Sequence, residues 1–267
     1  MTDERAIELF TEFRRNFHTS LVSEYVEPPR LSGGEPMRGY MIPFFDAASD
    51  TLRELRNSIN EFQRWINTLN AWQPIYARSD QSEQFSLLLQ HIRPYSALVL
   101  GAPQALRGRL IYAATACCGH ANYDLHHSNQ RLQWADGHVS MKVASRVGQP
   151  WTKWPALAEA LGDIGQGDFS DETDDFRNQR EHGHPRNIAL GLTSAISVRT
   201  DGESRSWAFG SKQAIPLEDV IRLSVEQHPL VCRAYRAFCE LVEEQFTALM
   251  NAYPMVATPP QPQSAAE

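Results

Sequence analysis

The chain has 267 residues, of which 42% are hydrophobic and 10% aromatic, as is usual for a protein that buries a substantial core. A formal net charge of −7 argues against binding to nucleic acid through a large positive field, but leaves room for a local basic pocket. The absence of a C-x-x-C pair weakens the zinc-finger and thioredoxin hypotheses. The sequence starts unlike a signal peptide and has no run of eighteen apolar residues. The same features predict a cytoplasmic protein that does not cross a membrane.

The first part of the chain predicts a helix, an irregular connection and a longer helix. Residues 3–17 carry apolar side chains at near-helical spacing, whereas residues 27–43 are rich in proline and glycine. Residues 1–44 are therefore expected to form an N-terminal helix and its connection. Apolar residues then recur every three or four positions from Leu52 to Trp72, which predicts a helix that Pro74 ends.

The middle of the chain predicts further helices. One is expected over residues 81–100, bent at Pro94, and a long helix rich in Ala and Cys is expected to start at Pro103. Its adjacent cysteines, Cys117 and Cys118, are expected to fill the core rather than form a disulfide. The sequence predicts irregular structure over residues 128–150 and a short helix over residues 154–164.

In residues 194–210 (SAISVRTDGESRSWAFG) the apolar residues no longer recur at helical spacing but at every second position, which predicts a β-hairpin. Apolar and polar residues alternate on both sides of Asp201-Gly202, which is a type I′ turn pair. Trp207 and Phe209 on one face of this hairpin are expected to pack on the helices.

The last helix is expected to begin at Pro216 and to be kinked or divided by Pro229. Residues 254–267 are expected to form a disordered tail by composition. The predicted fold is therefore mainly all-α: an antiparallel helical bundle over residues 45–253, with one β-hairpin inserted before the last helix.

The polar stretch FRNQREHGHPRN (176–187) is the strongest candidate for a functional site. Ser170 and the acidic residues after it predict the start of a helix that continues through His182, and Gly183 and Pro185 predict its end. Such a polar helix is either a solvated connector or part of a site.

Arginine and histidine together suit the cleavage of RNA. A histidine that titrates near neutrality can take a proton from a ribose 2′-hydroxyl or give one to a leaving 5′-oxygen. A permanently charged arginine can hold the scissile phosphate, and RNA alone supplies the internal nucleophile. Arg177, Asn178, His182 and His184 are the candidate catalytic residues, with Asn178 in a positioning role.

The run from Arg177 to His182 resembles the Arg-Asn-x-x-x-His motif of HEPN domains, and His184 fits the longer spacing of the same motif. This resemblance implies an all-α bundle that commonly forms a homodimer with the motifs of both chains at one cleft. It also implies a metal-independent endoribonuclease of a toxin–antitoxin or phage-defence system, which acts on RNA without a cofactor. An antitoxin or another partner protein would then be expected as well.

Four further residues are candidates for holding the RNA phosphates. Arg180 and Arg186 flank the motif, and His126 and His127 lie at the end of the Ala/Cys-rich helix.

Two alternatives are open at this stage. The arginines can instead pair with Asp171, Asp174 or Glu181 on a solvated helix end, in a non-catalytic interaction module such as an antitoxin, immunity or scaffold protein. The other alternative is a metal-dependent bundle enzyme, with ligands among His120, His126 and His127, although surface or helix-capping roles suit these histidines better.

Overall fold

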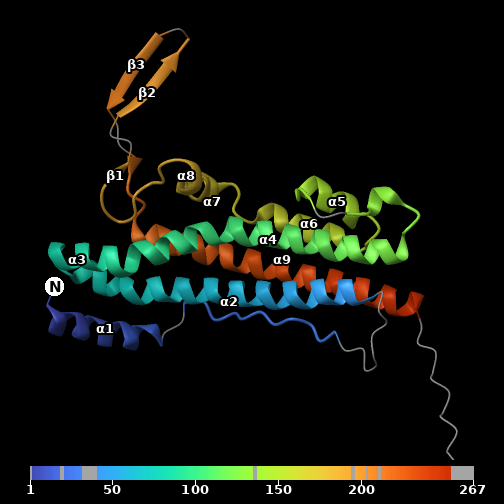
Figure 1. Cartoon of the computed structure of the whole chain (residues 1–267). Coiled ribbons are helices and arrows are strands. Elements are labelled where there is room, and N and C mark those ends of the chain that lie inside the picture. Colours follow the sequence, from blue (N-terminus) through green and yellow to red (C-terminus); the bar gives the residue numbers. More distant parts are fainter. Residues whose placement is uncertain are drawn as a thin grey trace, which may run out of the picture.

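The computed structural model describes residues 2–18, 21–31, 41–134, 137–193, 196–202, 204–209 and 212–253. Its core consists of three long helices that pack against one another, α2 (Ile42–Arg78), α4 (Arg93–Leu125) and α9 (Leu217–Ala252). This confirms the mainly all-α bundle. Helix α2 runs opposite to the other two, while α4 and α9 point the same way because the segment between them returns along the outside of the bundle (Figure 1). The expected tail, residues 254–267, lies outside the described residues.

Small and large apolar side chains share the core. Cys117 and Cys118 of α4 are free thiols that are fully buried, as expected, and leave space for the larger residues of α2 and α9. The hydroxyl of the fully buried Tyr235 donates to the backbone carbonyl of Leu52 over 3.0 Å, and so ties α9 to α2. None of the described helices is long and apolar enough to span a membrane.

Proline does not end the long helices where the sequence predicts it. Pro74, Pro103 and Pro229 lie inside α2, α4 and α9, so the predicted end of α2, the predicted start of α4 and a division of α9 were wrong. Proline removes one helical hydrogen bond, but packing of the apolar face on both sides keeps these helices continuous. At Pro94 the type of helix changes, because the turn before it, Leu88–Ile92, is a π-helix.

Helix α1 (Asp3–Phe17) packs on α2 near the π-helical turn, through stacked rings. The ring of Phe13 lies 4.5 Å from that of Trp72, which lies 4.4 Å from the imidazole of His91, both measured between centroids. The interplanar angles are 15° and 11°, so the three rings form one continuous stack. The π-helical turn thus places His91 where α1 and α2 meet.

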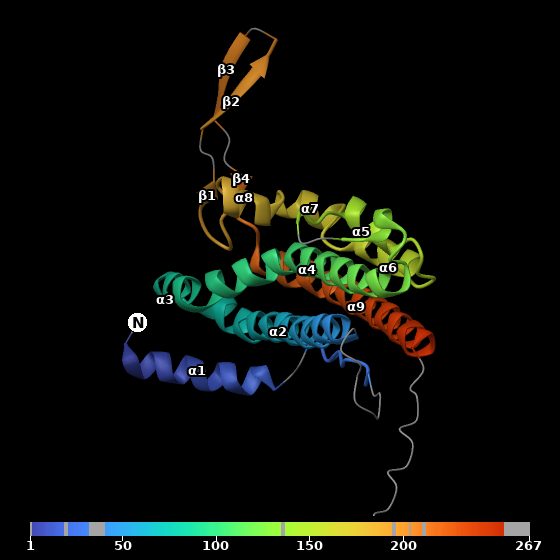
Figure 2. The same ribbon diagram turned by 45° about the vertical axis from the view of Figure 1, so that its right-hand side comes forward.

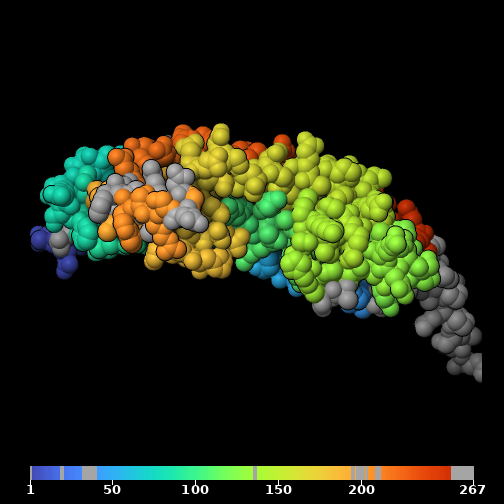
Figure 3. Space-filling view, turned by 90° about the horizontal axis from the view of Figure 1, so that it is seen from above, coloured from blue at the N-terminus to red at the C-terminus, as the bar shows by residue number. Residues whose placement is uncertain are grey.

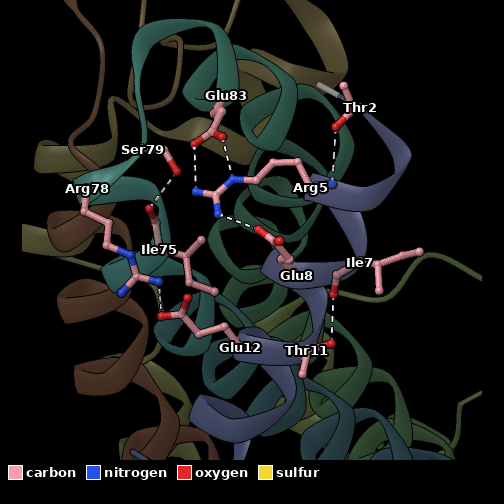
Figure 4. Close-up of polar contacts among 10 residues, drawn as sticks. All are labelled: Thr2, Arg5, Ile7, Glu8, Thr11, Glu12, Ile75, Arg78, Ser79 and Glu83. Atoms are coloured by element: carbon pink, nitrogen blue, oxygen red, sulfur yellow. Dashed lines mark hydrogen bonds and ion pairs between the residues drawn. The ribbon is translucent and has the colours of Figure 1, made fainter.

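Ion pairs also hold α1 in place (Figure 4). Arg5 bonds the carboxylate of Glu83 in α3 (Gln81–Leu87) through Nε at 2.7 Å and Nη2 at 3.4 Å. Glu12 pairs with Arg78 at the end of α2. Both pairs are on or near the surface, so they orient α1 more than they stabilise it.

The chain between α4 and α9 forms short elements over the outside of α4 and α9 (Figures 1 and 2). In order, these are a 3-10 turn at Gln130–Leu132, α5 (Met141–Gly148), α6 (Trp154–Asp163), α7 (Asp168–Thr173) and α8 (Phe176–His182). The predicted short helix over 154–164 is confirmed, whereas the prediction of irregular structure over 128–150 missed α5, which Ser140 caps through its side chain.

One buried asparagine joins this segment to the bundle. Asn122 of α4 donates to the carbonyls of Leu132 at 2.9 Å and Val147 at 2.8 Å, and its side-chain oxygen accepts from the indole of Trp151 at 3.0 Å. Since Asn122 is fully buried, these three bonds fix the position of α5 on α4.

Strands β2 (Ile196–Asp201) and β3 (Ser204–Phe209) confirm the predicted hairpin, but its turn is one residue later than expected. Asp201 pairs with Ser204, so the loop starts at Gly202, which has the left-handed φ of 59°. The short pair β1 (Leu192–Thr193) and β4 (Lys212–Gln213) forms the base of the hairpin.

The hairpin projects away from the helices (Figures 1 and 2). Trp207 is 70% exposed, so the expectation that it packs on the bundle was wrong. The side chain of Phe209 lies outside the described ones. An alternating sequence specifies the hairpin itself, but not a surface on which it packs.

Candidate functional site

The polar stretch forms a separate short helix instead of the end of a longer one. Asp174 and Asp175 adopt left-handed backbone angles, with φ of 58° and 47°, and the amide of Asp175 donates to the carbonyl of Ser170 over 2.8 Å. This is the hydrogen-bond pattern of a helix end. Ser170 therefore lies inside α7 rather than capping α8, and α8 begins at Phe176, whose buried ring anchors it.

Helix α8 directs two arginines towards α4. Arg177, Arg180 and Glu181 share one face of the helix and line a groove between α2, α4 and α8. The Nε of Arg177 donates to the carboxylate of Glu181 over 3.1 Å. This is the i, i+4 pairing expected of a solvated helix end.

The groove has a volume of about 470 Å³ and its floor is formed by small residues. Helix α4 contributes Ala97, Gly101, Ala102 and Ala105, and a second hollow of about 490 Å³ continues along the same helices past Gly108. Figure 3 looks onto this face, where the green surface of α4 lies between the gold region around residue 180 and the lime region of α5. Small side chains leave the groove open because they do not reach the level of α8.

The two hollows together are mixed in charge. They contain Arg109, Arg177 and Arg180, but also Glu54, Glu61 and Glu181. The Nη1 of Arg109 donates to the hydroxyl of Ser58 over 2.6 Å. The three carboxylates weaken any purely electrostatic attraction of the groove for an anion.

The pocket on the other side of α8 is basic. It has a volume of about 350 Å³, and its charged lining residues are Arg93, Arg180 and Arg186, with no acidic residue among the described ones. Arg186 is held in place, because it donates to the carbonyls of Gln213 at 2.9 and 3.0 Å and of Glu172 at 2.8 Å. Arg180 donates to the carbonyl of Ala97 at 3.2 Å and lines both the groove and this pocket.

The structure brings together only part of the predicted site. Arg177 and Arg180 line the groove, and Arg180 and Arg186 line the basic pocket. Asn178, His182 and His184 are exposed and do not occur among the described residues that line either. Five residues correspond to roughly 140° around a helix, so His182 points away from the face that carries Arg177.

His126 and His127 lie far from this region. His126 ends α4, and its ring lies 6.3 Å from that of Trp151, measured between centroids. His126 follows Arg109 by 17 positions along α4, which corresponds to about 25 Å at ~1.5 Å per residue. The structure therefore does not place these two histidines beside Arg177.

A metal site at the end of α4 does not form either. Among the described residues, the one group of three or more side chains that converge as metal ligands is Glu24, His228 and Cys232. His120, His126 and His127 are not part of it. The sequence prediction missed the group of Glu24, His228 and Cys232 because its members come from two segments that only the fold brings together.

Two residues of the groove and pocket were also missed. Arg93 precedes a proline, and Arg109 follows the small residues of α4 at helical spacing. The spacing of Gly101, Ala105 and Gly108 was a signal for one open face of α4.

No family model matches the sequence, and no curated protein or solved structure is significantly similar to it. The chemistry of the site must therefore be inferred from its own residues.

Proposed function

We propose that the protein is a HEPN-like, metal-independent endoribonuclease that binds RNA along both sides of α8 in the cytoplasm. The observation that carries the proposal is the basic pocket of Arg93, Arg180 and Arg186, in a chain whose net charge is −7. Guanidinium groups bind phosphate in a two-point grip, and a pocket without carboxylates suits an anion.

In this proposal, one RNA phosphate occupies the basic pocket and its neighbour lies in the groove beside Arg177. Arg180 lines both and is the link between them. Arg177 exchanges its contact with Glu181 for the scissile phosphate, which costs little because the ion pair is exposed.

The histidine is supplied across a homodimer. His182 points away from the Arg177 of its own chain, so the proposed cleavage site consists of Arg177 and the partner's His182 or the partner's His184. The exposed histidine takes the proton of the 2′-hydroxyl, whose oxygen attacks the phosphorus as the bond to the 5′-oxygen breaks, and the 5′-oxygen leaves with a proton from the histidine or from water. Asn178 orients the histidine. A defence or toxin–antitoxin role and an antitoxin partner belong to the same proposal.

Cleavage of labelled RNA in the presence of EDTA tests the chemistry. We expect products that end in a 2′,3′-cyclic phosphate, and we expect Arg177→Ala and the His182→Ala/His184→Ala double variant to reduce the rate at least ~100-fold. Arg146→Ala, an exposed arginine of α5, is the matched control and should cleave at the wild-type rate. Wild-type activity in both site variants would rule out the proposed roles.

Binding tests the pocket separately from catalysis. Arg93→Ala should weaken the binding of single-stranded RNA and reduce the slope of log K against log salt by about 0.7, the contribution of one phosphate contact on a single strand. Arg146→Ala should change neither quantity. An unchanged salt slope in Arg93→Ala would exclude a phosphate from the pocket.

A non-catalytic interaction module is the second candidate, and the Arg177–Glu181 ion pair favours it. In that case the projecting hairpin with its exposed Trp207 contacts the partner protein. RNA that remains intact at high protein concentration, with no RNA binding, would select this candidate over the first.

A further inference from the structure

Three side chains with metal-ligand atoms converge where an N-terminal segment crosses the last helix. Glu24 belongs to the irregular segment 21–31, and His228 and Cys232 belong to α9. Their ligand atoms all lie within 4.8 Å of one another. None of these residues is part of the groove or of the basic pocket around α8.

The imidazole and the thiol already have the separation of two ligands of one ion. His228 and Cys232 are four residues apart and so share one face of α9. The Sγ atom lies 3.7 Å from Nδ1 and 3.8 Å from Nε2. In a tetrahedral zinc site, bonds of about 2.3 Å to sulfur and ~2.0 Å to nitrogen place these ligands roughly 3.5 Å apart.

Two asparagines of α2 hold the segment that presents the carboxylate. Asn67 accepts from the amide of Val22 at 3.0 Å and donates to its carbonyl at 2.8 Å, and Asn60 makes the same pair of bonds with Val26 at 3.1 and 3.2 Å. The backbone is therefore fixed on both sides of Glu24. Val22 and Val26 are buried, whereas the Glu24 side chain is 41% exposed.

A buried thiol beside a histidine could also be a nucleophile, but this environment argues against that chemistry. Burial raises the pKa of Cys232 to about 12 and lowers the pKa of His228. Cys232 is also fully buried, so no substrate reaches its sulfur.

We propose that Glu24, His228 and Cys232 bind one zinc ion, with water in the fourth position, and that the ion fastens segment 21–31 to α9. Thiolate, imidazole and carboxylate are ligands that zinc accepts together. The thiol releases its proton when the ion binds. The open position lies on the side of Glu24, where solvent reaches the site.

Arg236 supports this arrangement. It forms an ion pair with Glu24. A carboxylate has two oxygens, so one can remain with Arg236 while the other binds the ion. This orients the ligand, as hydrogen-bonding partners of metal-bound carboxylates commonly do.

Cobalt(II) is the probe for the site, because a thiolate bound to it gives a charge-transfer band in the near ultraviolet. EDTA-treated and dialysed full-length protein should bind one equivalent of cobalt with this band, and zinc should displace it. Cys232→Ser should abolish the band, and Glu24→Gln should weaken binding by roughly tenfold or more. Cys239→Ser, on the same helix but outside the cluster, should bind as the wild type does.

A second measurement reports on the segment. Zinc should slow amide hydrogen exchange at residues 22–26 and raise the melting temperature of the wild type more than that of Glu24→Gln at the same zinc concentration. Glu24 is exposed, so this variant is expected to fold normally. A thiolate band that survives Cys232→Ser, or no cobalt binding by the wild type, would overturn the assignment. RNA cleavage in EDTA tests the proposed function independently of either outcome.

Discussion

Gly148, the last residue of α5, illustrates how closely the return segment packs. A Cβ atom at this position would lie 2.3 Å from Cδ2 of the Trp154 indole, far inside van der Waals contact. The indole is 6% exposed and packs among buried residues, so it has little room to move aside.

We expect Gly148→Ala to lower the free energy of unfolding by about 1–3 kcal/mol, because the new methyl group overpacks the joint between α5 and α6. Urea denaturation followed by circular dichroism measures this change. The matched control is Gly162→Ala in α6, where a Cβ would meet no atom within 4 Å. The control should be neutral or slightly stabilising, and equal stability of the two variants would contradict the packing.

His91 predicts a pH dependence of stability. Burial lowers its pKa below the usual value of about 6.5. When the pH falls below that value, the unfolded chain takes up a proton that the folded protein still resists, so the free energy of unfolding decreases. His91→Phe keeps a ring against Trp72 and removes the titration. The loss of stability between pH 7 and pH 5 should therefore be smaller in His91→Phe than in the wild type, and an equal loss would contradict this role.

Single residues could be predicted from the sequence where their neighbours are local. The burial of Cys117 and Cys118 followed from helix periodicity, and the pairing of Arg177 with Glu181 from a spacing of four residues. The basic pocket could not be predicted, because Arg93 and Arg186 meet through the packing of α8 on α4.

At the scale of elements, the hairpin of β2 and β3 is the part of the fold least connected to the rest. Its strands pair extensively with each other and make no extensive contact with any described helix (Figure 2). Trp207 is largely exposed. The hairpin should therefore contribute little to the stability of the bundle.

Deletion of residues 196–209 tests this directly. Thr193 and Lys212 are already paired, so residues 194, 195, 210 and 211 would close the base as a four-residue loop, a common hairpin length. We expect the melting temperature to change by no more than ~2 °C, as measured by differential scanning calorimetry. A much lower melting temperature would show that the hairpin stabilises the helices.

Helix types were easier to predict than helix ends. Apolar periodicity located α2 and α9, which each bury one long face, and the run rich in Ala and Cys located α4. Proline was a poor guide to their ends, since Pro74, Pro103 and Pro229 all lie inside helices whose packing outweighs one lost hydrogen bond. The division between α7 and α8 depends on the left-handed angles of Asp174 and Asp175, which no local pattern predicted.

At the scale of the whole molecule, stability is concentrated in α2, α4 and α9, which form most of the core. Helix α1 buries only Leu9 fully among its described residues, and the hairpin packs mainly on itself. Regions with few buried contacts open at lower free energy than the core.

Hydrogen exchange followed by mass spectrometry should reproduce this order. The middle of α2, α4 and α9 should exchange only through global unfolding, whereas α1 and β2–β3 should exchange orders of magnitude faster through local opening. Protection of α1 equal to that of α9 would contradict the order.

The mainly all-α class was predictable from periodicity, but the parallel run of α4 and α9 was not, because it depends on the course of the segment between them.

The parallel run of α4 and α9 also has a consequence for biosynthesis. Helices α2 and α4 leave the ribosome first, and their shared apolar face has no cover until α9 follows. The roughly 90 residues between α4 and α9 take ~5–20 s to synthesise at ~5–20 residues per second. During this time the two helices of the nascent chain expose an apolar face that can aggregate. We therefore expect the yield of folded protein in cells to depend on chaperones that bind exposed apolar helices.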